Sequence, residues 1–148
     1  MPNMNIDNFL QLTGRIETKD MSKAILENKD GSRKIRFTMA VQDNYRKKDG
    51  TQSKQDIPVE AFIPAAMVKV ENGVESYGIY STLRTGDNIS IIGHLEDNNY
   101  QDANGKMVYG GLIVRIDALK HRESKSTADA RAAQKAAAAA AAAPADAE

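Results

Sequence analysis

The feature that most constrains this chain is an alternation of apolar and polar residues that repeats every two positions. It is clearest between residues 34 and 41, where the apolar members are Ile35, Phe37, Met39 and Val41. Successive side chains of an extended strand point to opposite faces, whereas a helix would scatter these residues around its axis. The segment is therefore predicted to be a β-strand with one buried face, and Phe37 is predicted to lie in the core.

Shorter alternations of the same kind recur up to about residue 120, with typical turn residues between them. We expect further strands at residues 9–16, continued at 25–26, and at residues 57–62, 83–94 and 108–119. Gly14, inside the first strand, predicts a bulge or a close approach of another backbone. Residues 64–80 interrupt the series, and we expect a short helix near residues 65–70. Five or so strands with one helical connection predict an all-β fold, a small closed barrel.

The composition changes sharply near His121, which divides the chain into a folded domain, residues 1–122, and a tail, residues 123–148. Residues 136–143 are eight consecutive alanines, and alanine has the highest helix propensity. The tail has no apolar stripe to bury, so we expect it to be flexible, partly helical or disordered. Its removal after Ser124 is expected to leave folding nearly intact.

Residue types and spacings that support catalysis are scarce. The chain has no cysteine, which excludes disulfides and cysteine-bound metals. Its two histidines, His94 and His121, lack ligand-like neighbours, and no nucleophile elbow, phosphate loop or zinc spacing occurs. We expect no catalytic residue, no metal and no cofactor, and we expect that the protein is not an enzyme. The acids that a metal-dependent nuclease would need are scattered and are expected to be solvated: Asp20, Glu27, Glu96 and Asp97.

Targeting signals are not apparent. The start of the sequence has no basic segment followed by an apolar run, so no signal peptide is expected. No run of eighteen strongly apolar residues occurs, so no membrane span is expected either. Together with the lack of cysteine, these features favour a cytoplasmic protein without a membrane partner.

The charge is balanced overall but not locally. Lys and Arg together number 20, as do Asp and Glu, whereas a nucleic-acid-binding protein usually has a basic surplus. Residues 33–54 nevertheless hold seven cations against two acids, an excess of five positive charges. The cations of this segment are Arg33, Lys34, Arg36, Arg46, Lys47, Lys48 and Lys54.

Three aromatic residues occupy positions that a core does not explain. Tyr45 lies in the polar loop at residues 43–50, beside Arg46, Lys47 and Lys48. Tyr100 lies at the edge of a second polar loop, residues 97–102. Phe62 ends its strand on the face opposite Ile57 and Val59. Exposed aromatic rings beside cations suit base stacking along a phosphate track. The alternatives are a merely solvated basic hairpin around Tyr45 and a Phe62 covered by residues 64–80.

Four segments, in order, resemble the bacterial single-stranded DNA-binding protein family. They are LTGRI at residues 12–16, RKIRFTMAVQDNYRKKDG at 33–50, FIPAA at 62–66 and the stretch from LRTGD to GLIV at 83–114. The resemblance covers about residues 5–120, with gaps in loops. It implies a five-stranded OB-fold barrel in which Tyr45, Phe62 and Tyr100 stack with bases. The cations expected to follow the DNA backbone are Lys34, Arg36, Arg46, Lys47, Lys48 and Lys54.

The chain also departs from the family pattern. A family tryptophan position falls on or near Asp56, which cannot stack, so weaker binding is expected. Family members usually form tetramers, so the resemblance implies a homo-oligomer. The longer connection at residues 66–83 departs from the family pattern, so the resemblance does not extend to a tetramer in particular. The end of the chain, PADAE, has the acidic character of the family tip but not its terminal apolar residue, so recruitment through it is doubtful. These departures favour an accessory, plasmid- or phage-type member.

The expected function is sequence-independent binding and protection of single-stranded DNA in replication, recombination or transfer of a mobile element. RNA is the nearest alternative ligand, because the same surface stacks bases of either sugar. A protein-interaction module without nucleic-acid binding is the alternative that the balanced overall charge favours.

Overall fold

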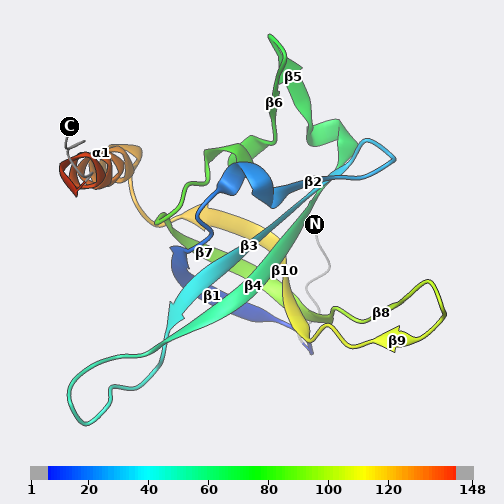
Figure 1. Ribbon diagram of the computed structural model, residues 1–148, viewed down its shortest axis with the longest axis horizontal. Helices are drawn as coiled ribbons and strands as arrows, with labels where there is room; N and C mark the ends of the chain where they lie inside the picture. The colour runs from blue at the N-terminus through cyan, green and yellow to red at the C-terminus, as the bar shows by residue number, and fades with distance from the viewer. Residues whose placement is uncertain (1–6, 143–148) are drawn as a thin grey trace, which may run out of the picture.

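The structure is a computed structural model that describes residues 7–142. Its centre is a closed barrel of β1 (Leu10–Ile16), β3 (Arg33–Gln42), β4 (Lys54–Ile63), β7 (Asn88–Asp97) and β10 (Leu112–His121) (Figure 1). The strands follow the order β1-β7-β10-β4-β3, and a second pairing of β1 with β3 closes the ring. β4 and β10 are parallel, and the other pairs are antiparallel. The predicted all-β, OB-type barrel is confirmed.

The alternation of apolar residues sets the two faces of the barrel wall. In β3, Ile35, Phe37 and Met39 are buried, while Lys34 and Arg36 between them are turned outward. β4 continues the same core with its own alternate residues, and β7 and β10 supply the rest. The predicted core position of Phe37 is confirmed. The main members of the core from these other strands are Val59, Ala61, Ile63, Ile89, Ile91, Val114 and Ile116.

Two glycines allow strands to cross at close range. A Cβ atom on Gly14 would lie 2.2 Å from the carbonyl oxygen of Ala40, and one on Gly93 would lie 2.2 Å from that of Arg115. No side chain can be placed at such a distance, so any larger residue would push the strands apart. The predicted close backbone approach at Gly14 is confirmed, and it lies where β1 meets β3 and closes the barrel.

The connection between β4 and β7 is mostly a hairpin rather than the short helix expected near residues 65–70. Its helical parts are two 3₁₀ turns, η2 (Ala65–Met67) and η3 (Gly78–Thr82). Between them, β5 (Lys69–Glu71) pairs with β6 (Val74–Ser76), and the hairpin projects from the barrel (Figure 1). Asn72 and Gly73 both have positive φ, as an Asn-Gly hairpin turn requires, and β-branched Val70 and Val74 favour strands.

Three short strands and one 3₁₀ turn complete the β part. η1 (Met21–Ala24) leads into β2 (Ile25–Glu27), which pairs with the start of β3. β8 (Tyr100–Gln101) and β9 (Met107–Val108) form a second projecting hairpin between β7 and β10.

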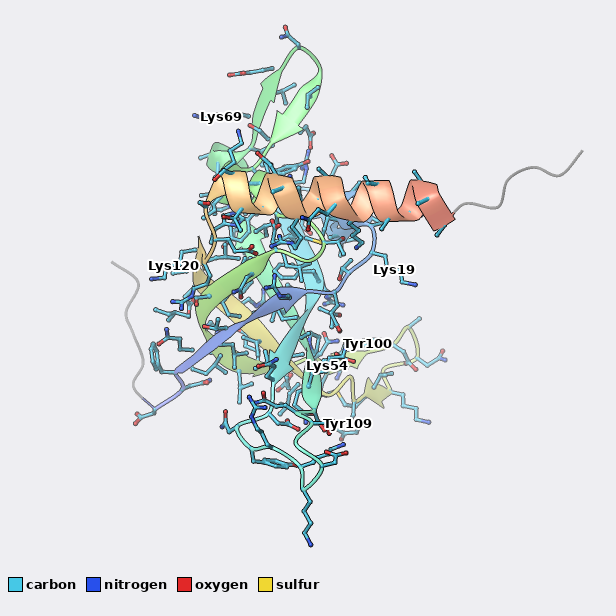
Figure 2. All side chains as sticks on the ribbon, turned by 90° about the vertical axis from the view of Figure 1, so that its left-hand side faces the viewer. Lys19, Lys54, Lys69, Tyr100, Tyr109 and Lys120 are labelled. Carbon is cyan, nitrogen blue, oxygen red and sulfur yellow. The ribbon has the colours of Figure 1, made fainter. Side chains whose placement is uncertain are left out.

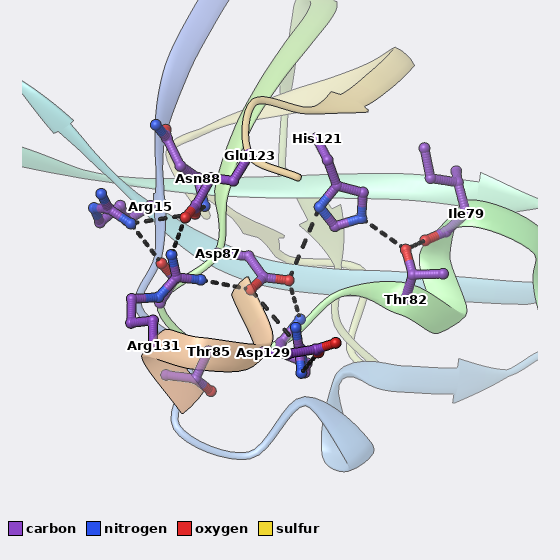
Figure 3. Close-up of polar contacts among 12 residues, drawn as sticks. Arg15, Ile79, Thr82, Thr85, Asp87, Asn88, His121, Glu123, Asp129 and Arg131 are labelled. Carbon is purple, nitrogen blue, oxygen red and sulfur yellow. Dashed lines mark hydrogen bonds and ion pairs between the residues drawn. The ribbon is translucent and has the colours of Figure 1, made fainter. Parts of the chain in front are cut away.

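The tail forms one helix, α1 (Lys125–Ala142), which crosses one end of the barrel and extends beyond it (Figure 2). The helical part of the sequence expectation is confirmed. Contact with the barrel was not predicted. Arg131 donates to Asp87 at 2.9 Å (Figure 3), Arg84 donates to Asp129 at 2.9 Å, and Ala128 of α1 is buried. Arg131 also pairs with Glu123 (Figure 3).

The rest of α1, from residue 132 to 142, is exposed. Residues 143–148, on which the expectation about the acidic end rests, lie outside the described residues. Within residues 7–142 no helix combines the length and the apolar character needed to cross a membrane.

Candidate nucleic-acid interface

The outer face of β3 and β4 brings three of the predicted residues together. In the antiparallel register, Lys34 lies opposite Phe62 and Arg36 lies opposite Glu60. Phe62 points outward because its neighbours Ala61 and Ile63 fill the core, and 50% of its surface is exposed. An apolar ring thus lies beside two cationic side chains on an open sheet face. The connection at residues 64–80 leaves half of the Phe62 side chain uncovered.

Ion pairs extend across this face. Glu60 lies opposite Arg115 of the parallel strand β10, and Arg115 lies opposite His94 of β7. The carboxylate of Glu60 accepts hydrogen bonds from Arg36 at 2.6 and 2.9 Å. It also forms ion pairs with Arg115 Nη1 at 3.0 Å and with Lys34 Nζ at 3.5 Å. Glu60 is 1% exposed, so this carboxylate is buried in the middle of an outward-facing surface.

The row continues through a histidine that two carboxylates hold. Arg115 also donates to Glu96 at 2.7 Å, and the His94 ring nitrogens lie 2.9 Å from Glu96 and 2.9 Å from Asp117. Hydrogen bonding to Asp117, and next to Glu96, raises the pKa of His94 above its usual value. The hydrogen bond from His94 in turn lowers the pKa of Glu96. The acids of this row therefore neutralise much of the charge of its cations.

The predicted basic loop joins β3 and β4 and projects from the barrel (Figure 1). Its tip is an ordered turn in which Lys47 and Thr51 share a backbone hydrogen bond and Asp49 accepts from Thr51. These bonds to Thr51 lower the pKa of Asp49. Tyr45 is 66% exposed, and within residues 7–142 neither Lys47 nor Lys48 forms a salt bridge. To the other described residues, Arg46 donates only a long hydrogen bond, 3.4 Å to the Gly50 carbonyl.

Tyr100 lies on the other projecting hairpin, β8–β9, and is 57% exposed. The two hairpins leave the barrel on different sides (Figure 1), so Tyr45, Phe62 and Tyr100 do not form one cluster. They are separate aromatic positions, with Phe62 on the sheet and one tyrosine on each hairpin. An extended strand of nucleic acid, rather than a compact ligand, matches such a distribution.

Lys54, at the start of β4, is less available than its sequence position predicts. It pairs with Glu17 and lies 3.5 Å from Asp56. Asp56 occupies the position where the family resemblance has a tryptophan, so this part of the face has an ion pair in place of an aromatic ring.

An open groove of about 950 Å³ runs between β1 and the base of the basic loop. Its lining includes Gly14, Ala40, Arg15, Lys54 and several carboxamides. Carboxamides both donate and accept hydrogen bonds, so they can meet any base edge or a sugar. The Asn and Gln residues of the lining are Gln11, Gln42, Asn44, Gln52, Gln55 and Asn88.

Two residues of this surface escaped the sequence analysis. Tyr109, directly after β9, is the most exposed large apolar or aromatic side chain of the described residues, at 79%. Its position before Gly110 and Gly111, at the end of the polar hairpin that begins at Tyr100, was a usable signal. Arg115 reaches Glu60 only through the register of two parallel strands, and no sequence pattern indicates that contact.

Among the described residues, no group of three or more His, Asp or Glu side chains is placed to hold a metal ion. No known family model matches the chain. A search of curated proteins likewise found no significant match.

Proposed function

We propose that this protein binds single-stranded DNA without sequence preference, through the outer face of β3 and β4 and the two projecting hairpins. The observation that carries the proposal is Phe62, a half-exposed ring near the end of β4 on the outer sheet face, with Lys34 opposite it. A base that stacks on this ring removes apolar surface from water, and its phosphate falls within reach of the neighbouring cations.

The two hairpins extend the same mode of binding. Tyr45 and Tyr100 each offer an exposed ring to a further base, and stacking contributes about 1–3 kcal/mol of binding free energy per base. Arg46, Lys47 and Lys48 attract the phosphates near Tyr45. Neither stacking nor phosphate contact depends on base identity, which is why the binding is sequence-independent.

The same proposal includes the biological setting that the family resemblance implies. We propose an accessory member of the single-stranded DNA-binding protein family, acting as a cytoplasmic homo-oligomer in replication, recombination or transfer of a plasmid or phage. The Asp56–Lys54 ion pair in place of an aromatic ring supports weaker binding than a main replication factor needs.

The test is binding of fluorescently labelled oligo-dT, the equivalent RNA and a duplex of the same length, each over a salt series. We expect oligo-dT to bind best and the duplex least, because paired bases cannot stack on protein rings. Equal or tighter binding of RNA would favour an RNA-binding protein instead. Absence of binding at low salt would overturn the proposal in favour of a protein-interaction module.

A further inference from the structure

A buried carboxylate lies in the middle of the face that carries Phe62. Glu60 is two residues before Phe62 on the same side of β4, and both point away from the core. Exposed sheet faces of nucleic-acid-binding proteins attract phosphate through positive charge, and a fixed negative charge there opposes it. Its burial shows that Glu60 is engaged by its neighbours rather than by water.

The contacts of Glu60 use the hydrogen-bonding groups that a phosphate needs. Arg36 directs Nε and Nη2 at one carboxylate oxygen, while Arg115 Nη1 and Lys34 Nζ approach the other. A guanidinium presents the same forked donors to a carboxylate as to a phosphate. Arg115 is further occupied by Glu96. Within residues 7–142, Arg36 Nη1 has no partner, and Lys34 Nζ has only its 3.5 Å ion pair with Glu60.

We propose that Glu60 is an internal competitor of DNA phosphate, which occupies Arg36 and Lys34 beside Phe62 and thereby keeps binding weak and reversible. This inference rests on the proposed function and names a residue that limits affinity at that site. Because Glu60 is a fixed neighbour of these cations, an incoming phosphate has to share them with a negative charge a few ångströms away. The attraction between phosphate and cations is reduced accordingly.

The test is the variant Glu60→Gln, which keeps the shape and an acceptor oxygen but removes the charge. We expect the salt dependence of oligo-dT binding to steepen by about 0.7 in the log–log slope, the value of one added phosphate contact on a single strand. At about 0.1 M salt, that slope corresponds to roughly fivefold tighter binding.

The matched control is Glu71→Gln on the exposed hairpin β5–β6, which changes the net charge of the protein by the same amount. Its affinity should change less than about twofold, with an unchanged slope, because contacts with phosphate are local. A second control replaces Arg36 by Gln in both backgrounds. In the Glu60→Gln background this replacement should remove the gain, whereas in the original protein it should cost little.

Thermal unfolding of each variant shows whether it is folded at the temperature of the binding experiment. If Glu60→Gln is not folded at that temperature, Glu60→Met carries the same prediction, since an apolar side chain of similar length suits a buried position. Failure of the original protein to bind would contradict the proposed function itself. If the original protein binds, but both Glu60 variants bind equally or more weakly with an unchanged slope, the competitor role is wrong.

Discussion

At the scale of single residues, three aromatic rings decide whether the protein contacts bases or only phosphates. Replacement of Phe62, Tyr45 or Tyr100 by Ala should each lower oligo-dT affinity by about 1–3 kcal/mol, because a base then has no ring on which to stack. The salt slope should hardly move, since no phosphate contact changes. The measurement is a titration of each variant, with tyrosine emission as reporter because the chain has no tryptophan.

The chain offers two control rings, one exposed away from the proposed site and one buried in the core. Phe9 is 47% exposed, close to the value for Phe62, but it precedes β1, which pairs with β7 and β3 and not with β4, so Phe9→Ala should bind like the parent. Phe37→Ala should lose about 3–5 kcal/mol of unfolding free energy, because this ring is buried. Parent-like binding by all three aromatic variants would mean that DNA, if bound, lies elsewhere.

His94 gives a residue-scale prediction for pH. Hydrogen bonds to Asp117 and Glu96 raise its pKa in the folded state, so the folded protein holds the proton more tightly than the unfolded chain. The stabilisation is fully present below the unfolded pKa of about 6.5 and is lost as the pH rises through the folded-state pKa. Urea unfolding at pH 5.5 and 8.5 should show this loss. His94→Gln should flatten the difference, and an equal pH dependence in that variant would contradict the assignment.

At the scale of elements, ion pairs join α1 to the barrel, and Ala128 is the buried apolar residue of this helix. Asp87 is 2% exposed, and Arg131 is its partner from α1 at 2.9 Å. Arg131→Ala should lower the unfolding free energy by about 1.5–3 kcal/mol, because a buried carboxylate loses a charged donor. Lys135→Ala, one turn later on the exposed part of α1, should change it by less than about 0.5 kcal/mol.

The same ion pair changes what truncation is expected to do. The sequence alone predicts that removal of the chain after Ser124 costs little stability, whereas the Arg131–Asp87 pair predicts a loss similar to that of Arg131→Ala. A shorter truncation after Ala132 keeps this pair and should be nearly neutral. Equal thermal midpoints for the original protein and the truncations after Ser124 and after Ala132 would show that α1 does not stabilise the barrel.

At the scale of the whole molecule, binding depends on where charge lies, because positive and negative charges are equal in number. Changing Arg46, Lys47 and Lys48 together to Ala should weaken oligo-dT and oligo-dA binding alike. The salt slope should fall by about 0.7 for each phosphate that the variant no longer neutralises. The control changes Lys19, Lys69 and Lys120 to Ala, which alters the net charge equally but away from the basic loop (Figure 2). Equal slopes in the two triple variants would mean that the loop is only a solvated turn.

The sequence alone determined which residues line the core and which face outward on the main strands. A period of two specifies the face of each side chain, so Phe37 could be assigned to the interior and Phe62 to the outside without a structure. The local basic surplus and the exposed position of Tyr45 were likewise visible, because both depend on residues adjacent in the chain.

The tertiary structure decided everything that depends on which strands are neighbours. The row of His94, Arg115, Glu60 and Arg36 joins segments far apart in the chain, and the parallel register of β4 and β10 alone brings Arg115 to Glu60. The same holds for Arg131 and Asp87. Periodicity assigns a side chain to a face but not to a partner, since partners follow from the closure and register of the barrel. These long-range contacts convert a basic strand into a face whose positive charge Glu60 and Glu96 partly neutralise.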